Sequence, residues 1–126
     1  MVECNYISFG ESAPYSDIVE VNDKLLFLSG LVSEDLEKGD LLPGDITAET
    51  RQVFTNLKGI LEAHGSDMAH VVRVDVMLSD FSERDEMNAE YVKHFPADRR
   101  PARVCLGCVD LAAGLKIEVT VIAAKK

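Results

Sequence analysis

The sequence has no tryptophan, only three cysteines and four prolines, and 13 Lys and Arg residues against 22 Asp and Glu. This shortage of basic residues gives a formal net charge of −9. Proteins that bind nucleic acids neutralise phosphates with clustered Lys and Arg, and the one dense basic cluster here, 99–103, is short. We therefore expect no nucleic-acid partner. No run of 18 apolar residues occurs and the first residues lack a basic start before an apolar stretch, so we expect neither a membrane span nor a secretory signal.

The cysteines, Cys4, Cys105 and Cys108, are odd in number. Without a secretory signal, this count indicates free thiols in a reducing compartment, so we expect a cytoplasmic protein. Cys105 and Cys108 have C-x-x-C spacing, but they fall in a segment that reads as strand, where residues three apart point to opposite faces. No second such pair completes a zinc site, and no glycine-rich phosphate-binding motif occurs. We expect no metal and no cofactor.

The length of 126 residues predicts one domain, 1–126, large enough to bury a core without disulfides or metals. Two β-rich runs around Asn22-Asp23 predict a hairpin over 17–30, because those residues tolerate positive φ. The segment 31–44 carries Gly, Pro and charged residues and reads as a loop. Asp45 predicts the start of a helix and Gly65 its end, with an apolar stripe at helical spacing between them.

The second half of the chain alternates between strands and one further helix. In the strand predicted over 71–78, Val72, Val74, Val76 and Leu78 fall on one face. Ser82 and Asp85 resemble a capping box that opens a helix, which ends at Pro96. The segments 102–109 and 115–123 read as the last strands. This order predicts an α+β fold with one sheet of about six strands and two helices packed on one face. The other sheet face needs a partner, and oligomerisation would cover it.

Arg103 is the side chain best suited to bind a small ligand. It lies at the start of a strand and is flanked by apolar residues, where an unpaired cation is costly. One interpretation is an internal salt bridge; the other is bidentate capture of a ligand carboxylate. Glu118 is the second candidate, either neutralising Arg103 or Lys116, or holding and activating a water molecule.

Other polar side chains carry weaker signals. Cys105 shares a face with Arg103, and it reads either as a small apolar packing residue or as a nucleophile without an evident base. Tyr15 follows a proline in an irregular segment and could close over a ligand. Tyr91 fits the apolar stripe of the second helix, and Asn88 reads as a surface or packing residue. The three histidines are scattered and form no triad or metal site.

Taken together, these segments resemble the RidA family, also called YjgF. The resemblance runs in order over nearly the whole chain, and its most specific part is Pro-Ala-Arg followed fifteen residues later by Glu. The matching segments are Ala13-Pro-Tyr-Ser16, Leu28-Ser-Gly30, Asn56-Leu-Lys58, Val71–Val76, Asn88-Ala-Glu-Tyr91, Pro101-Ala-Arg103 and Lys116-Ile-Glu-Val119.

The resemblance implies a chorismate-mutase-like homotrimer in which three sheets form an inner barrel and ligands bind in clefts between subunits. It also implies hydrolytic deamination of reactive 2-imino or enamine acids to 2-keto acids and ammonia, without a cofactor. Arg103 corresponds to the arginine that grips the substrate carboxylate and Glu118 to the glutamate that positions water. Cys105, Tyr15 and Gly30 correspond to residues that line the pocket.

The sequence departs from the family pattern at three positions. Ala13 replaces the usual Gly before Pro-Tyr, Leu31 replaces a frequent Gln after Ser-Gly, and Val104 stands where Ser or Thr is common. The hypothesis is therefore an imine/enamine deaminase acting on a small carboxylate-bearing substrate. The alternative is a non-catalytic, small-carboxylate-binding or regulatory trimer that uses the same pocket.

Overall fold

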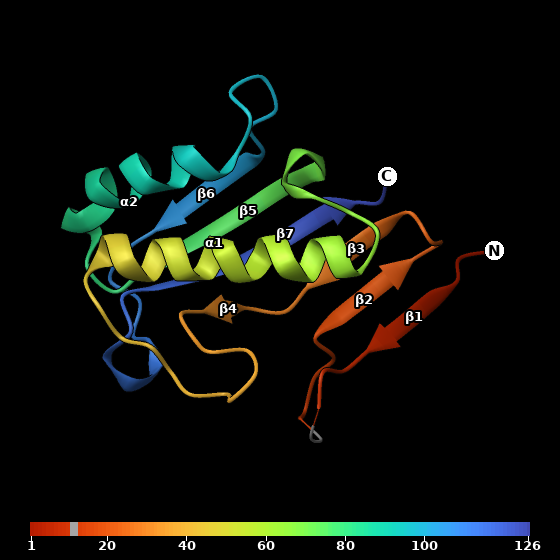
Figure 1. The fold of residues 1–126 in the computed structure, drawn as a ribbon, viewed down its shortest axis with the longest axis horizontal. Coiled ribbons are helices and arrows are strands. Elements are labelled where there is room, and N and C mark those ends of the chain that lie inside the picture. Colours follow the sequence, from red (N-terminus) through yellow and green to blue (C-terminus); the bar gives the residue numbers. More distant parts are fainter. Residues whose placement is uncertain (11–12) are drawn as a thin grey trace.

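The computed structural model describes residues 1–10 and 13–126, in which seven strands form one sheet and two helices pack against it (Figure 1). The strands are β1 (Cys4–Ile7), β2 (Ile18–Val21), β3 (Leu25–Leu28), β4 (Leu31–Val32), β5 (Val71–Leu78), β6 (Ala102–Leu106) and β7 (Ile117–Ala124). The helices are α1 (Ile46–Ala63) and α2 (Arg84–Tyr91), with 3-10 turns at Met68–His70, Phe81–Glu83, Val92–His94 and Ala112–Gly114.

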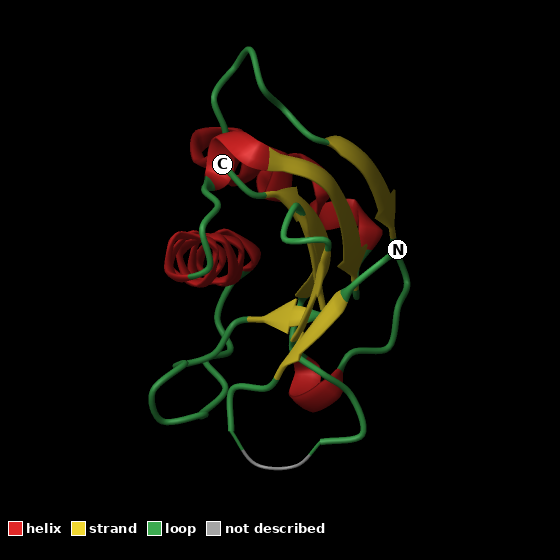
Figure 2. Ribbon diagram, turned by 90° about the vertical axis from the view of Figure 1, so that its right-hand side faces the viewer, coloured by secondary structure: helices red, strands yellow, loops and turns green. Residues whose placement is uncertain are grey.

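The sheet has the strand order β1-β2-β3-β7-β5-β6, with β4 also paired to β7. β5 and β6 run parallel, and the other pairs run antiparallel. Both helices lie on one side of the curved sheet (Figure 2). The predicted α+β fold, with a single sheet and two helices on one face, is therefore confirmed. β1 and the two-residue β4 were not predicted.

The first half of the fold follows local rules closely. Asn22 and Asp23 have φ of 53° and 54°, which forms the tight turn of the β2–β3 hairpin. The Asp45 carboxylate accepts a hydrogen bond from the Ala48 N–H (2.7 Å) and caps α1. Gly65, with φ of 83°, follows the end of α1. The buried stripe of α1 includes Val53, Phe54, Leu57, Ile60 and Leu61.

Two predicted details of the second half are wrong. Val72 was expected on the buried face of β5, but it is 46% exposed while Val71 is buried. The register with β7 shifts between Val71 and Arg73, and this irregularity changes the alternation. The expected Ser82–Asp85 capping box is also absent. Instead the Asp80 carboxylate accepts hydrogen bonds from the Ser82 N–H and hydroxyl, which begins a 3-10 turn before α2.

The predicted end of the strand over 102–109 is also wrong. β6 ends at Leu106 rather than at residue 109, so Cys108 lies beyond the strand, exposed and with φ of 57°. Gly107 permits this exit, because a Cβ on it would lie 2.3 Å from the Phe81 Cβ. All three cysteines are free thiols.

The sheet face opposite the helices is open and partly apolar. Phe27 lies there beside Val19, and Val104 beside Asp75. The exposed apolar side chains of this face are Tyr6, Leu25, Phe27, Val104 and Leu106. They form two groups, one on β1 and β3 and one on edge strand β6, with β7 and β5 between them. Isolated exposed apolar residues are common on monomers, but such groups on one sheet face are typical of a surface that contacts another protein.

Candidate functional site

Arg103 lies on edge strand β6, in register with buried Val74 of β5, so its side chain points toward the helices. Its Nη1 donates a 2.7 Å hydrogen bond to Asn88 Oδ1 on α2. Its guanidinium carbon lies 4.7 Å from the ring centroid of Tyr91, which is a cation–π contact. Within residues 1–10 and 13–126, no carboxylate oxygen lies within 4.0 Å of it. The internal salt bridge considered from sequence does not form there, and the guanidinium remains available to an external anion.

The guanidinium of Arg103 borders a hollow of about 360 Å³. The lining residues are Asn88, Tyr91, Val92, Arg100, Pro101 and Arg103. The Tyr91 side chain is buried, its hydroxyl has no hydrogen-bond partner among the described residues, and burial raises its pKa. Tyr91 therefore contacts Arg103 through its aromatic ring and supplies no negative charge to it. The sequence predicted a surface or packing role for Asn88 and a core position for Tyr91, and it did not reveal that both hold this arginine.

Cys105 lies on the same face of β6 as Arg103, as predicted, in register with Val76. It is partly buried and packs against the hydrophobic core. Burial raises the pKa of its thiol, although the charges of Arg103 and Arg84 oppose this effect. The thiol is thus kept protonated at neutral pH, which favours the packing role over the nucleophilic one.

Three other predicted residues meet at a second hollow, of about 310 Å³, lined by Tyr15, Ser29, Gly30 and Glu118. Glu118 of β7 pairs with Val32 of β4, and its side chain lies directly against Gly30. A Cβ at position 30 would come within 2.5 Å of Glu118 Oε2, so only glycine leaves the carboxylate in this place. The tyrosine is exposed and stands at the rim.

Hydrogen bonds hold the peptide that leads to Gly30. Ser29 donates through its hydroxyl to the Ser16 carbonyl (2.6 Å) and through its backbone N–H to the Asp17 carbonyl (2.9 Å). Behind this peptide is a smaller cavity of about 130 Å³, which reaches Ile60 of α1. Burial, reinforced by the nearby charge of Asp17, raises the pKa of Glu34 in that cavity.

The two hollows lie on different sides of the sheet. Glu118 is in register with Met77, whereas Arg103 is in register with Val74, and side chains an odd number of residues apart on β5 point to opposite faces. One copy of the chain therefore presents Arg103 with Cys105 on the helix side, and Glu118 with Tyr15 and Gly30 at the other hollow. Sequence spacing could not reveal this separation.

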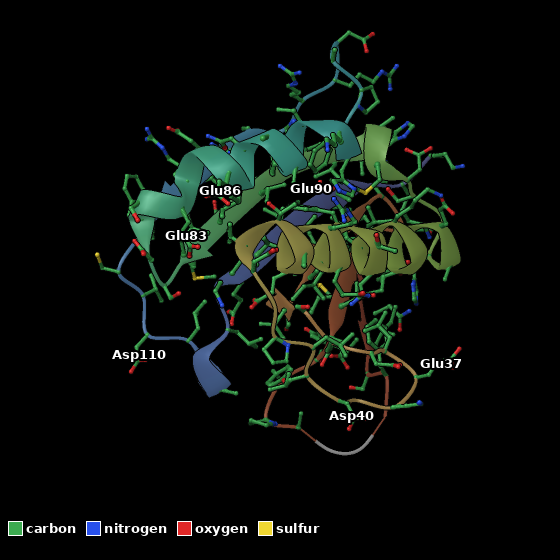
Figure 3. All side chains as sticks on the ribbon, turned by 60° about the vertical axis from the view of Figure 1, so that its left-hand side comes forward. Glu37, Asp40, Glu83, Glu86, Glu90 and Asp110 are labelled. Carbon is green, nitrogen blue, oxygen red and sulfur yellow. The ribbon has the colours of Figure 1, made fainter. Side chains whose placement is uncertain are left out.

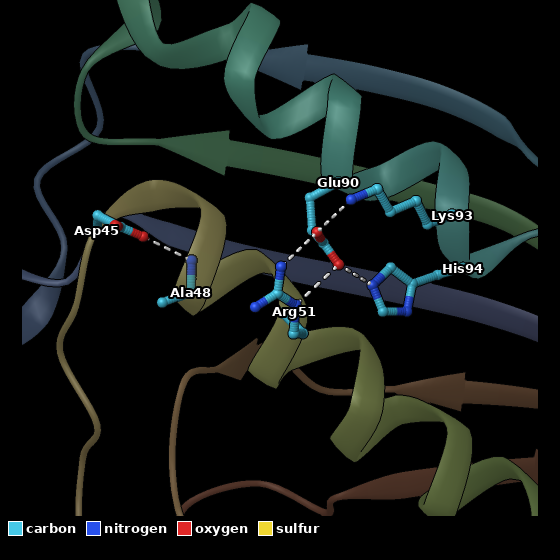
Figure 4. Close-up of polar contacts among 6 residues, drawn as sticks. All are labelled: Asp45, Ala48, Arg51, Glu90, Lys93 and His94. Atoms are coloured by element: carbon cyan, nitrogen blue, oxygen red, sulfur yellow. Dashed lines mark hydrogen bonds and ion pairs between the residues drawn. The ribbon is translucent and has the colours of Figure 1, made fainter.

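A charge cluster fixes the helix that supports Arg103. The buried carboxylate of Glu90 on α2 accepts hydrogen bonds from Arg51 of α1 (3.0 and 3.3 Å), from Lys93 (3.4 Å) and from His94 (2.8 Å) (Figure 4). Of the acidic side chains labelled in Figure 3, Asp110 extends outward from a loop, whereas Glu90 lies between the two helices.

Burial alone would raise the pKa of Glu90, but hydrogen bonds from Arg51 and His94 outweigh it. With the charges of Arg51 and Lys93, they lower the pKa of Glu90 from 4.5 to about 2. The carboxylate therefore stays ionised and ties α2 to α1 across the neutral pH range.

Among the described residues, no group of three or more His, Cys, Asp or Glu side chains is arranged to hold a metal ion. None of the described helices is both long and apolar enough to span a membrane.

Residues 8–125 match the family model described as endoribonuclease L-PSP. The chain belongs to this family. It is 36% identical over 113 residues to a RutC family protein of Pyrococcus horikoshii, covering 90% of this chain and 88% of that protein. It is also 36% identical over 110 residues to the 2-iminobutanoate/2-iminopropanoate deaminase of Mus musculus, covering 87% and 80%.

Solved structures agree with this assignment. The crystal structure of yeast Mmf1 superimposes with a TM-score of 0.87 at 30% identity, over 98% of this chain and 100% of that one. A member of the YjgF protein family from Neisseria meningitidis gives 0.82 at 32% identity, over 98% and 96%. The resemblance to the RidA/YjgF family is thus confirmed. Relatives of comparable identity bear different names, such as protein HMF1 of yeast, so membership alone does not fix the activity.

Proposed function

We propose that this protein hydrolyses reactive 2-imino acids, such as 2-iminopropanoate, to 2-keto acids and ammonia. Each turnover consumes one water molecule and needs no cofactor. The observation that carries this proposal is the guanidinium of Arg103, which Asn88 and Tyr91 hold in place and no described carboxylate neutralises. A fixed guanidinium that is free on one side suits bidentate capture of a carboxylate. The deaminases named among the relatives support the same conclusion.

We further propose that the working unit is a homotrimer in the cytoplasm, with each site built by two copies. The separation of Arg103 from Glu118 within one chain supports this, because a small substrate cannot touch both sides of the sheet. The two groups of exposed apolar side chains on the open face, which include Phe27 and Leu106, give copies a surface to bury. Three free thiols are typical of a reducing compartment.

In the proposed reaction, Arg103 of one copy binds the substrate carboxylate and orients the C=N carbon toward Glu118 of the next. Glu118 accepts a proton from water as the oxygen attacks that carbon, and the proton passes to the imine nitrogen. The hydroxyl group of the resulting carbinolamine then gives its proton, through Glu118, to the amine nitrogen. The C–N bond breaks as the C=O bond of the 2-keto acid forms, and ammonia leaves. Imines already hydrolyse in water, so orientation and one proton carrier supply the acceleration.

The test measures ammonia and 2-keto acid release from 2-iminopropanoate generated in situ by an amino-acid oxidase. We expect release above the buffer rate, and a fall in kcat/KM of at least roughly tenfold in Arg103→Ala, since a charge-assisted contact is lost. Arg99→Ala is the matched control, because Arg99 is exposed and does not line the Arg103 hollow. A wild-type rate equal to buffer would refute the proposal.

A further inference from the structure

The basic side chains of this acidic protein are not evenly paired. Within residues 1–10 and 13–126, seven Lys and Arg side chains lie within 4.0 Å of a carboxylate: Arg51, Lys58, Arg73, Lys93, Lys116, Lys125 and Lys126. Among those without such a neighbour there, four belong to one stretch around α2 and β6: Arg84, Arg99, Arg100 and Arg103. In a chain of net charge −9, the run 99–103 holds three of these four arginines and no acidic residue, so it is a local positive region.

Two of these arginines, Arg100 and Arg103, line the same hollow of about 360 Å³. They are three positions apart in the chain, so their Cα atoms are at most about 11 Å apart and two long side chains can converge. The charges of both reach the phenol of Tyr91, where they oppose the effect of burial on its pKa. Two like charges that border one hollow repel each other, and an anion between them relieves that repulsion.

One carboxylate satisfies Arg103 but leaves Arg100 without a counter-charge. A single dianion pairs with both cations. It costs the translational and rotational entropy of one bound molecule, whereas two separate anions would cost that of two. We propose that the Arg103 hollow selects substrates with a second acid group, the 2-imino dicarboxylic acids, and that Arg100 is the specificity-determining residue. Arg103 binds the carboxylate beside the imine, and Arg100 binds the distal carboxylate.

This inference rests on the proposed function, and it names the substrate class of the same site. For the five-carbon case, a 2-imino dicarboxylate and water give 2-oxoglutarate and ammonia, with the same bonds formed and broken as above. Arg100 takes no part in those steps. Its contribution is electrostatic and partly exposed to solvent, which limits the expected preference to roughly fivefold.

Binding measurements on the full-length protein test the inference without relying on turnover. The probes are 2-oxoglutarate and 2-oxopentanoate, which have the same carbon number and differ at the distal carboxylate. We expect wild-type protein to bind 2-oxoglutarate roughly fivefold more tightly in low salt, with a smaller ratio at 0.5 M NaCl. Arg100→Gln abolishes the ratio and Arg100→Lys retains part of it. Arg99→Gln is the matched control and keeps the wild-type ratio.

The inference is overturned by a wild-type ratio near one, by a ratio that persists in Arg100→Gln, or by an equal loss in Arg99→Gln, which would indicate a general surface field. Failure to bind either acid also overturns it. The proposed function is judged separately, by ammonia release from 2-iminopropanoate. A protein that hydrolyses this monocarboxylate but does not prefer 2-oxoglutarate would keep the deaminase proposal and lose the specificity proposal.

Discussion

The separation of Arg103 from Glu118 predicts that two inactive variants restore each other. Arg103→Ala removes the proposed carboxylate clamp, and Glu118→Gln removes the proposed proton acceptor, so each pure variant is expected to be nearly inactive. The Glu118→Gln chain still has Arg103, and the Arg103→Ala chain still has Glu118. Where the first chain supplies the arginine and the second supplies the glutamate, the site between them is therefore intact.

The size of the effect follows from the proposed trimer, taken as a closed ring of three copies. A mixed trimer contains two chains of one variant and one of the other. In either case, one of its three sites is intact. Mixed trimers should therefore show about one third of the wild-type rate. An unfractionated equimolar mixture, in which about a quarter of all assemblies contain one variant alone, should show about one quarter.

The assay co-expresses the two variants with different affinity tags, purifies mixed assemblies over both resins, and measures ammonia release from 2-iminopropanoate. The control co-expresses Arg103→Ala chains carrying one tag with Arg103→Ala chains carrying the other. Its rate should stay at that of the pure variant. Mixed assemblies that are no more active than their parents would refute the reasoning, because they would place both residues in a site made by one chain.

Further predictions concern stability and positioning. Glu90→Gln should lower the free energy of unfolding by about 3 kcal/mol at pH 7, since the pKa of Glu90 falls from 4.5 to about 2 on folding. That contribution is present above pH 4.5 and is lost as pH falls toward 2, so wild type and variant should converge in acid urea titrations. Gly30→Ala should displace the Glu118 carboxylate and lower kcat roughly 10- to 100-fold, with little change in melting temperature. Asn88→Ala should release Arg103 and raise KM about tenfold.

Each of these has a result that contradicts it. A stability gap between wild type and Glu90→Gln that stays constant from pH 7 to pH 3 would show that the carboxylate charge is not its cause. Glu62→Gln, which breaks the exposed pair with Lys58, is the control and should cost less than about 1 kcal/mol. Full activity in Gly30→Ala, or an unchanged KM in Asn88→Ala, would remove the corresponding positioning role.

The sequence predicted the turns and helix ends that depend only on neighbouring residues. The turn at Asn22-Asp23, the cap at Asp45 and the glycine after α1 each depend on backbone preferences of a few neighbouring residues. The start of α2 was predicted less well, because Asp80 and not Ser82 supplies a capping oxygen, and it caps the 3-10 turn before α2 rather than α2 itself. Both residue types are good caps, and the sequence alone does not decide between them.

The details that could not be predicted depend on pairing between distant strands. The irregular register of β5 with β7 reverses the expected exposure of Val72, and no local pattern encodes it. Residue types identified Arg103 and Glu118 as candidates, but their faces follow from which residue of β5 each one opposes. Asn88 was missed as the support of Arg103 because an amide in a helix carries no distinctive spacing.

The two-sided role of α2 has a consequence for how this protein can vary. One side of this eight-residue helix hydrogen-bonds Arg103 through Asn88, and another is anchored through Glu90 to Arg51. Arg51 is itself more than half exposed on the outer helix. A substitution at this outward-facing position can therefore shift α2, and with it the position of Arg103, while every residue that lines the Arg103 hollow stays the same.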